Sequence, residues 1–123
     1  MFRIYLTGRV TFEGSVVVDE SALPGPLGRS LAAMLALSRG PVSRSRLADI
    51  LWDGNPPRAY DRSINPLLSK LRAASEGAGG PRDLFMSGSG TVELRRSPQV
   101  WIDLEHATIA LDAAEGILRS GFP

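Results

Sequence analysis

The chain of 123 residues contains no cysteine and a single histidine, His106. The absence of cysteine excludes a disulfide scaffold, a thiolate metal site and a cysteine nucleophile. No apolar run approaches the roughly 20 residues that span a bilayer, and the segment from Phe2 to Thr7 is too short for a signal peptide. We therefore expect a soluble, cytoplasmic protein that does not enter a membrane.

Motifs for catalysis are also missing. The glycines stand at predicted turns and form no phosphate-cradling pattern, and the lone histidine has no paired carboxylates around it. Asp49, Asp53 and Asp61 are spread over a predicted helix and loop without histidine or cysteine support for a metal. We expect no enzymatic activity and no cofactor. The length corresponds to one ordinary domain with a single core.

The charge that is present is unevenly placed. The formal net charge is only +1, but the segment from Arg39 to Arg72 holds seven cationic and three anionic side chains, so that it carries 7 − 3 = +4. The remaining residues must then sum to −3. Such a local excess is typical of a small nucleic-acid contact surface, although a solvated helix face has the same composition.

Short alternating segments begin the chain. Phe2, Ile4 and Leu6 fall on one face, and after Gly8 the pattern continues with Val10 and Phe12. A further segment runs from 15 to 19, after Gly14. The alternation and the glycines predict three short strands joined by turns.

Two helices are predicted next. The first begins near Pro26 and ends before Gly40-Pro41, and its apolar residues recur at helical spacing: Leu27, Leu31, Met34 and Leu35. The second has Ser43 as its N-cap and Val42 and Leu47 as a hydrophobic staple. Its predicted apolar stripe consists of Leu47, Ile50 and Leu51, and the residues Asp53 to Pro57 end it.

A third helix is indicated by Ile64, Leu67, Leu68 and Leu71, with Gly77 at its end. Two starts are possible. Either Asp61 caps the helix and Pro66 lies in its second turn, or Asn65 caps a shorter helix with Pro66 at the first position.

The rest of the chain predicts a flexible connection over 77–81, then a β-hairpin with strands over 84–87 and 91–95. Asp103 is expected to cap a last helix from Leu104 to Arg119. We therefore divide the chain into residues 1–102 and a C-terminal helical segment, 103–123.

The order of these elements is that of a winged helix-turn-helix, an α+β fold with an N-terminal antiparallel sheet, a three-helix core and a C-terminal hairpin wing. Several short segments match in the same order: "LW" closing the second helix, "PP" in the turn, "LLSKLRAA" in the third helix, and "IDLEHA" after the hairpin. Together they resemble the OmpR/PhoB-type domain of the Streptomyces antibiotic regulatory protein (SARP) family of bacterial activators.

The resemblance implies a transcriptional regulator that binds double-stranded DNA, with the third helix in the major groove. It also implies side-by-side copies on direct repeats, and a loop from Asp53 to Tyr60 that is available to RNA polymerase. In that family a helical activation domain follows, and the segment from Leu104 resembles its beginning.

Advancing about 100° per residue from Ile64 places Arg62, Pro66, Ser69 and Ala73 opposite the buried face of the third helix. Arg62 and Lys70 are suited to phosphates or guanine, and hydroxyl and amide groups to either phosphates or base edges. Trp52 matches a family position near the DNA backbone, but it is equally suited to the core. The candidate DNA-binding residues are Arg44, Trp52, Arg62, Ser63, Asn65, Ser69, Lys70 and Arg72.

The same face offers an alternative. Pro66, Leu67 and Ala73 stand where base-reading side chains are common in the family, so direct readout by this helix is limited. An apolar patch of these three residues would instead favour a winged helix that has become a protein-interaction module.

Overall fold

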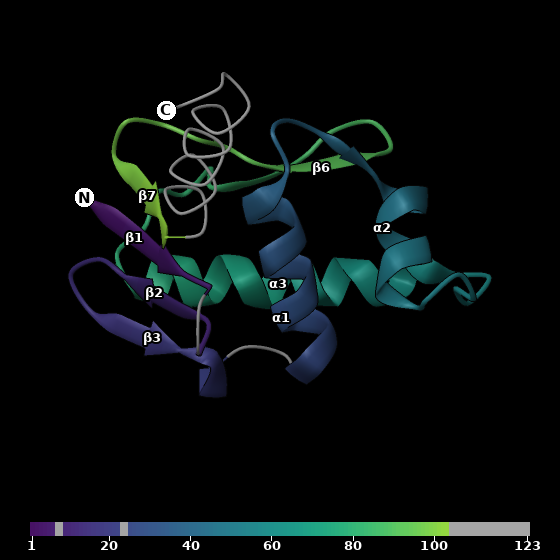
Figure 1. Ribbon diagram of the computed structural model, residues 1–123, viewed down its shortest axis with the longest axis horizontal. Coiled ribbons are helices and arrows are strands. Elements are labelled where there is room, and N and C mark those ends of the chain that lie inside the picture. The colour runs from purple at the N-terminus through teal and green to yellow at the C-terminus, as the bar shows by residue number, and fades with distance from the viewer. Residues whose placement is uncertain (7–8, 23–24, 104–123) are drawn as a thin grey trace, which may run out of the picture.

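The computed structural model describes residues 1–6, 9–22 and 25–103. Within these residues the chain forms an α+β fold with three α-helices and two β-sheets. Figure 1 shows the N-terminal sheet at one end, the long helix α3 running across the molecule, and α2 at the other end. The last helix predicted from Leu104, and His106 within it, lie outside the described residues.

The first sheet contains the three strands predicted at the N-terminus, β1 (Phe2–Tyr5), β2 (Thr11–Glu13) and β3 (Val17–Asp19), together with β7 (Val100–Ile102). Its order is β3-β2-β1-β7. The pairs among β1, β2 and β3 are antiparallel, but β7 lies parallel to β1, so the predicted antiparallel sheet is in fact mixed. The alternation is confirmed, since Phe2, Ile4 and Phe12 are buried. A short 3₁₀ turn, Glu20–Ala22, follows β3.

Asp103, the predicted cap, anchors the chain just after β7. Its Oδ1 accepts a hydrogen bond from the backbone N–H of Leu6 at 2.9 Å. The carboxylate therefore joins the ends of two neighbouring strands, β1 and β7, that are far apart in the sequence.

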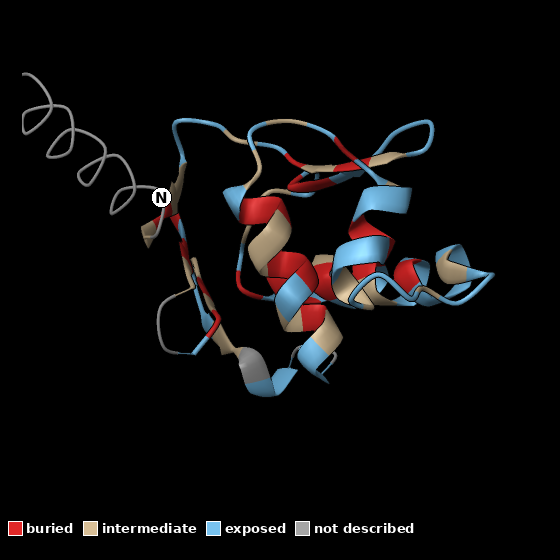
Figure 2. Ribbon diagram, turned by 45° about the vertical axis from the view of Figure 1, so that its right-hand side comes forward, coloured by how far each residue is buried: buried red, intermediate tan, exposed pale blue. Residues whose placement is uncertain are grey.

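The described residues form three α-helices: α1 (Gly25–Leu37), α2 (Arg44–Leu51) and α3 (Tyr60–Gly77). Buried residues of the helices and of both sheets form one hydrophobic core (Figure 2). Arg96 closes α1 by donating to the carbonyl oxygens of Ala36 and Ser38, which satisfies carbonyl groups that a helix end leaves free.

The second sheet is built from the predicted hairpin and a strand that the sequence did not indicate. β5 (Phe85–Ser87) and β6 (Thr91–Leu94) pair antiparallel, and β6 also pairs with β4 (Val42–Ser43), which gives the order β4-β6-β5. The two-residue strand β4 immediately precedes α2. It therefore ties the start of α2 to the hairpin.

Helix α3 begins earlier than either predicted start. Its N-cap is Ala59, without a side-chain hydrogen bond, so the caps predicted at Asp61 and at Asn65 are both wrong. Tyr60 is partly buried against the core and begins the first turn, where the negative charge of Asp61 is favourable. Pro66 consequently lies inside the helix, and its exposed position lets water reach the carbonyl oxygen that the missing N–H leaves unpaired.

Two further predictions are wrong. Ile50 is 52% exposed and not part of the core stripe of α2, because the buried face is centred between Leu47 and Ala48, roughly 100° away from it. The connection over 77–81 was predicted to be flexible, but Gly79 and Gly80 donate to the carbonyl oxygens of Glu76 and Ser75 and close α3 with a Schellman motif. No helix in the described part of the chain has the length and apolar character that crossing a bilayer requires.

Candidate nucleic-acid interface

The exposed face of α3 is the centre of the candidate interface. Arg62, Pro66, Ser69 and Ala73 are all exposed, as the helical spacing predicts. The other predicted contact residues on the flanks of this face are exposed as well: Ser63, Asn65 and Lys70. Ile64, Leu68 and Leu71 on the opposite side are buried. This division leaves a polar surface along the helix, about 27 Å long for its 18 residues.

Helix α2 begins next to this surface. The N-cap is confirmed, since Ser43 Oγ accepts a hydrogen bond from the backbone N–H of Arg46 at 3.2 Å. Arg44, the first residue of α2, turns its guanidinium toward α3, where Nη1 donates to Oδ1 of Asp61 at 3.2 Å and to Oδ1 of Asn65 at 2.9 Å. The Arg44 side chain is only 16% exposed. Arg44 therefore joins the two helices.

The hairpin borders the same surface. Arg72 donates from Nε to the carbonyl oxygen of Phe85 at 3.0 Å and from Nη2 to Oγ of Ser87 at 2.9 Å. The backbone N–H of Arg44 donates to the carbonyl oxygen of Gly90 at the hairpin turn, at 3.0 Å. Two predicted contact residues, Arg44 and Arg72, thus fix α2 and the hairpin relative to α3.

Trp52 lies at the C-cap of α2 and is partly buried against the core. Leu67 is likewise packed against the core. Both side chains therefore contribute to the core, which is the structural role that the sequence left open for Trp52.

Several cations at this end of the molecule differ from the paired arginines of the first sheet. Arg46, Arg58, Arg62 and Lys70 are exposed, and none of them forms an ion pair with a described residue. By contrast, exposed arginines on the first sheet and beyond the hairpin are paired with carboxylates, as in Arg3 with Glu13 and Arg95 with Asp83. Unpaired cations attract an external anion without first losing a partner.

An open hollow of about 440 Å³ lies beside the start of α2. Arg39 and Arg46 line it together with Ser38 and Ser43. Arg46, Arg58 and Arg39 were absent from the candidate contact residues, although each belongs to the cationic segment. Arg39 and Arg46 lie at the hollow beside α2, and Arg58 lies in the loop before α3; all three are exposed.

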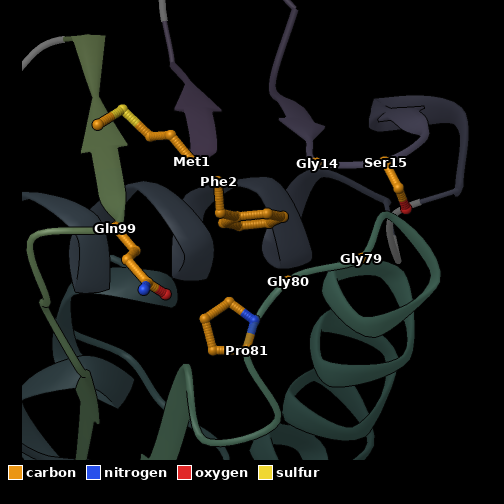
Figure 3. Close-up of a pocket in the computed structure, with 8 residues that line it drawn as sticks. All are labelled: Met1, Phe2, Gly14, Ser15, Gly79, Gly80, Pro81 and Gln99. Atoms are coloured by element: carbon orange, nitrogen blue, oxygen red, sulfur yellow. The ribbon is translucent and has the colours of Figure 1, made fainter.

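A second hollow, of about 490 Å³, lies at the opposite end between the first sheet and the end of α3 (Figure 3). Figure 3 shows Phe2 above Gly80, with Gly14, Ser15 and Gly79 closing the junction. A Cβ atom on Gly14 would lie 2.3 Å from the carbonyl oxygen of Ala78, and one on Gly80 would lie 2.8 Å from the Phe2 ring. The lining contains no charged side chain. These glycines permit close packing of the first sheet against the end of α3. We therefore assign the hollow to packing and not to a binding site.

The described residues include no group of histidine and carboxylate side chains suited to hold a metal ion. No family model matches the chain, and neither a curated protein nor a solved structure is significantly similar to it.

Proposed function

We propose that the chain is a winged-helix domain of a transcriptional regulator, with the exposed face of α3 in the major groove of double-stranded DNA. The observation that carries the proposal is the polar face of α3, with unpaired cations on it and beside it and with α2 and the hairpin fixed along it by Arg44 and Arg72. The major groove, about 12 Å wide, admits one α-helix. Arg62 and Lys70 lie about 12 Å apart along the axis of α3, so they can contact phosphates or bases at two separate points along the groove.

The connectivity supports a winged helix. The strand between α1 and α2 joins the hairpin that follows α3, in the order β4-β6-β5. Gly90 in the turn 88–90 accepts a hydrogen bond from Arg44 at the start of α2, and Ser87 accepts one from Arg72 of α3, which supports the assignment of the hairpin as a wing. The proposal includes the SARP-type activator role, copies on direct repeats, and a polymerase contact through the loop between α2 and α3, all of which rest on the sequence resemblance.

The side chains divide into two roles. Arg62 and Lys70 contact phosphates or guanine acceptors, and Ser63 and Ser69 add hydrogen bonds to phosphates or base edges. Arg46 and Arg58 extend the phosphate contacts beyond α3. Arg44 and Arg72, whose guanidinium groups already bind protein oxygens, hold the surface in shape.

A protein-interaction module fits the surface less well. Leu67 is packed against the core, so the exposed apolar side chains on this face are the small ones of Pro66 and Ala73. Protein interfaces are depleted of lysine and are centred on well-packed side chains that lose their contact with water. Two small side chains among unpaired cations do not provide such a centre.

Fluorescence anisotropy of the chain with a labelled random-sequence duplex tests the proposal. The logarithm of the binding constant falls by about 0.9 per neutralised phosphate for each tenfold rise in salt. With Arg46, Arg58, Arg62 and Lys70 engaged, we expect a slope of about −3 to −4. Absence of binding at low salt would reject DNA binding and favour the protein-interaction module.

A further inference from the structure

The contact between Arg44 and Asn65 has a consequence for base recognition that rests on the proposed function. Asn65 lies on the flank of α3, exposed, one turn after Asp61. The guanidinium of Arg44 has hydrogen-bond donors only. The atom of the Asn65 amide that faces the guanidinium must therefore be the oxygen, Oδ1. The distance of 2.9 Å between Arg44 Nη1 and this oxygen is that of a good hydrogen bond.

The amide nitrogen of Asn65 is left as the group that can reach a ligand. It carries two N–H donors, and no described residue accepts a hydrogen bond from it. A cation bound to the oxygen also polarises the amide, which strengthens its N–H groups as donors. Asp61 shares the same guanidinium and keeps it in place.

An asparagine with both groups available pairs with adenine, accepting from N6 and donating to N7. With its oxygen committed to Arg44, Asn65 is suited to acceptors alone. Guanine presents two neighbouring acceptors in the major groove, O6 and N7, and thymine presents O4, whereas adenine N7 stands beside the N6 donor, which the N–H groups of Asn65 cannot pair with. We propose that Arg44 is a positioning residue that holds Asn65 as a hydrogen-bond donor, so that Asn65 selects guanine or thymine and not adenine.

The test begins with selection from a library of random duplexes by the wild-type chain, followed by anisotropy on the selected duplex and on its single-base variants. We expect one position at which guanine or thymine is preferred over adenine by about fivefold or more. Selection of adenine at the position that depends on Asn65 would overturn the proposal.

Four variants locate the effect, two at Asn65 and two at Arg44. In Asn65→Asp the oxygen that binds Arg44 is kept and the N–H donors are lost, and in Asn65→Leu both are lost without a change of charge. Both should reduce the preference at that position to less than twofold. Because the preference is a ratio between two duplexes, a uniform change in affinity does not affect it.

Arg44→Met frees the Asn65 oxygen and should move the preference toward adenine. Arg44→Lys keeps a cationic donor and should retain the preference for guanine or thymine.

Thermal unfolding shows whether the Arg44 variants fold, and the Asn65 variants test the role of the Asn65 amide independently of Arg44. If wild type fails to bind any duplex, the proposed function is wrong. If wild type binds selectively and all four variants keep its preference, DNA binding stands and the role of Arg44 and Asn65 is rejected.

Discussion

The two ends of α3 lie in different environments. Its C-terminal end is enclosed by the first sheet, where Gly14 and Gly80 bring backbones into close contact and Val16 donates a backbone hydrogen bond to Ala78. Its N-terminal part presents an exposed, mostly polar face, next to the contacts that Arg44 of α2 and the hairpin make with α3. One side of α3 is buried along its whole length, but only its C-terminal end is also enclosed by the first sheet, while the exposed face toward the N-terminus keeps its cations available. Substitutions at the two ends of α3 separate these two contributions.

The largest expected effect is at the packed end. Gly14→Ala places a Cβ atom 2.3 Å from the carbonyl oxygen of Ala78, so the turn before β3 must move away from α3. We expect a loss of about 2–3 kcal/mol in the free energy of unfolding, measured by denaturant titration. DNA affinity of the folded variant should be unchanged.

Gly77→Ala is the matched control, because a Cβ atom there meets nothing within 4 Å. In the last turn of α3 it should stabilise the protein by about 0.5–1 kcal/mol. Equal effects of the two substitutions would contradict the assignment of close packing to Gly14.

Pro66→Ala tests the exposed end. Pro66 lies inside α3 and removes one helical hydrogen bond, at an exposed position where an alanine meets no steric barrier. We expect a gain of about 1–2 kcal/mol in the free energy of unfolding, against a change within about 0.5 kcal/mol for Ser69→Ala on the same face. A loss of stability in the Pro66 variant would show that the proline has a structural role.

Arg62→Ala and Lys70→Ala should each weaken DNA binding by about fivefold to tenfold and reduce the magnitude of the salt slope by about 1, with little effect on unfolding. Arg3→Ala, on the first sheet, makes the same change of charge and should leave the slope unaltered. Anisotropy at several salt concentrations measures all three. If Arg3→Ala weakened binding as much as the other two, net charge and not the face of α3 would govern affinity.

The smallest effect concerns Asp19, at the end of β3. The Ser21 hydroxyl and then the Ser21 backbone N–H donate to this carboxylate and hold its pKa below the ordinary value, with a smaller contribution from Arg9. A lowered pKa stabilises the fold above the unfolded-state pKa, and the contribution is lost as the pH falls through the folded-state value. NMR titration of Asp19 should show the low pKa, and Ser21→Ala should raise it. An unchanged pKa in that variant would contradict the stated cause.

Local patterns predicted much of this fold. The alternation of Phe2 and Ile4 gave the first strand, and the Ser43 cap and the hairpin turn were confirmed at the expected residues. The strands β4 and β7 were missed because each has only two or three residues and exists through pairing with a distant segment. The start of α3 depends on Tyr60 packing against the core, which no local signal reports.

The candidate site was predictable as a set of residues but not as an arrangement. Helical spacing placed Arg62 and Ser69 on the exposed face. Arg44 and Arg72 bind oxygens of residues that lie 21 and 13 positions further along the chain, on other elements. Such contacts decide which cations remain available, and they arise only when the helices and the hairpin pack together.

The most direct test of the central claim is an NMR titration of the labelled chain with a short duplex at low salt, in which each backbone amide reports its own environment. We predict that shifts concentrate on residues 62–70 of α3, the start of α2 and the hairpin turn 88–90, and that β1, β2 and β3 remain unchanged. Shifts centred on the first sheet, or no shifts at all, would contradict the assignment of the α3 face to DNA.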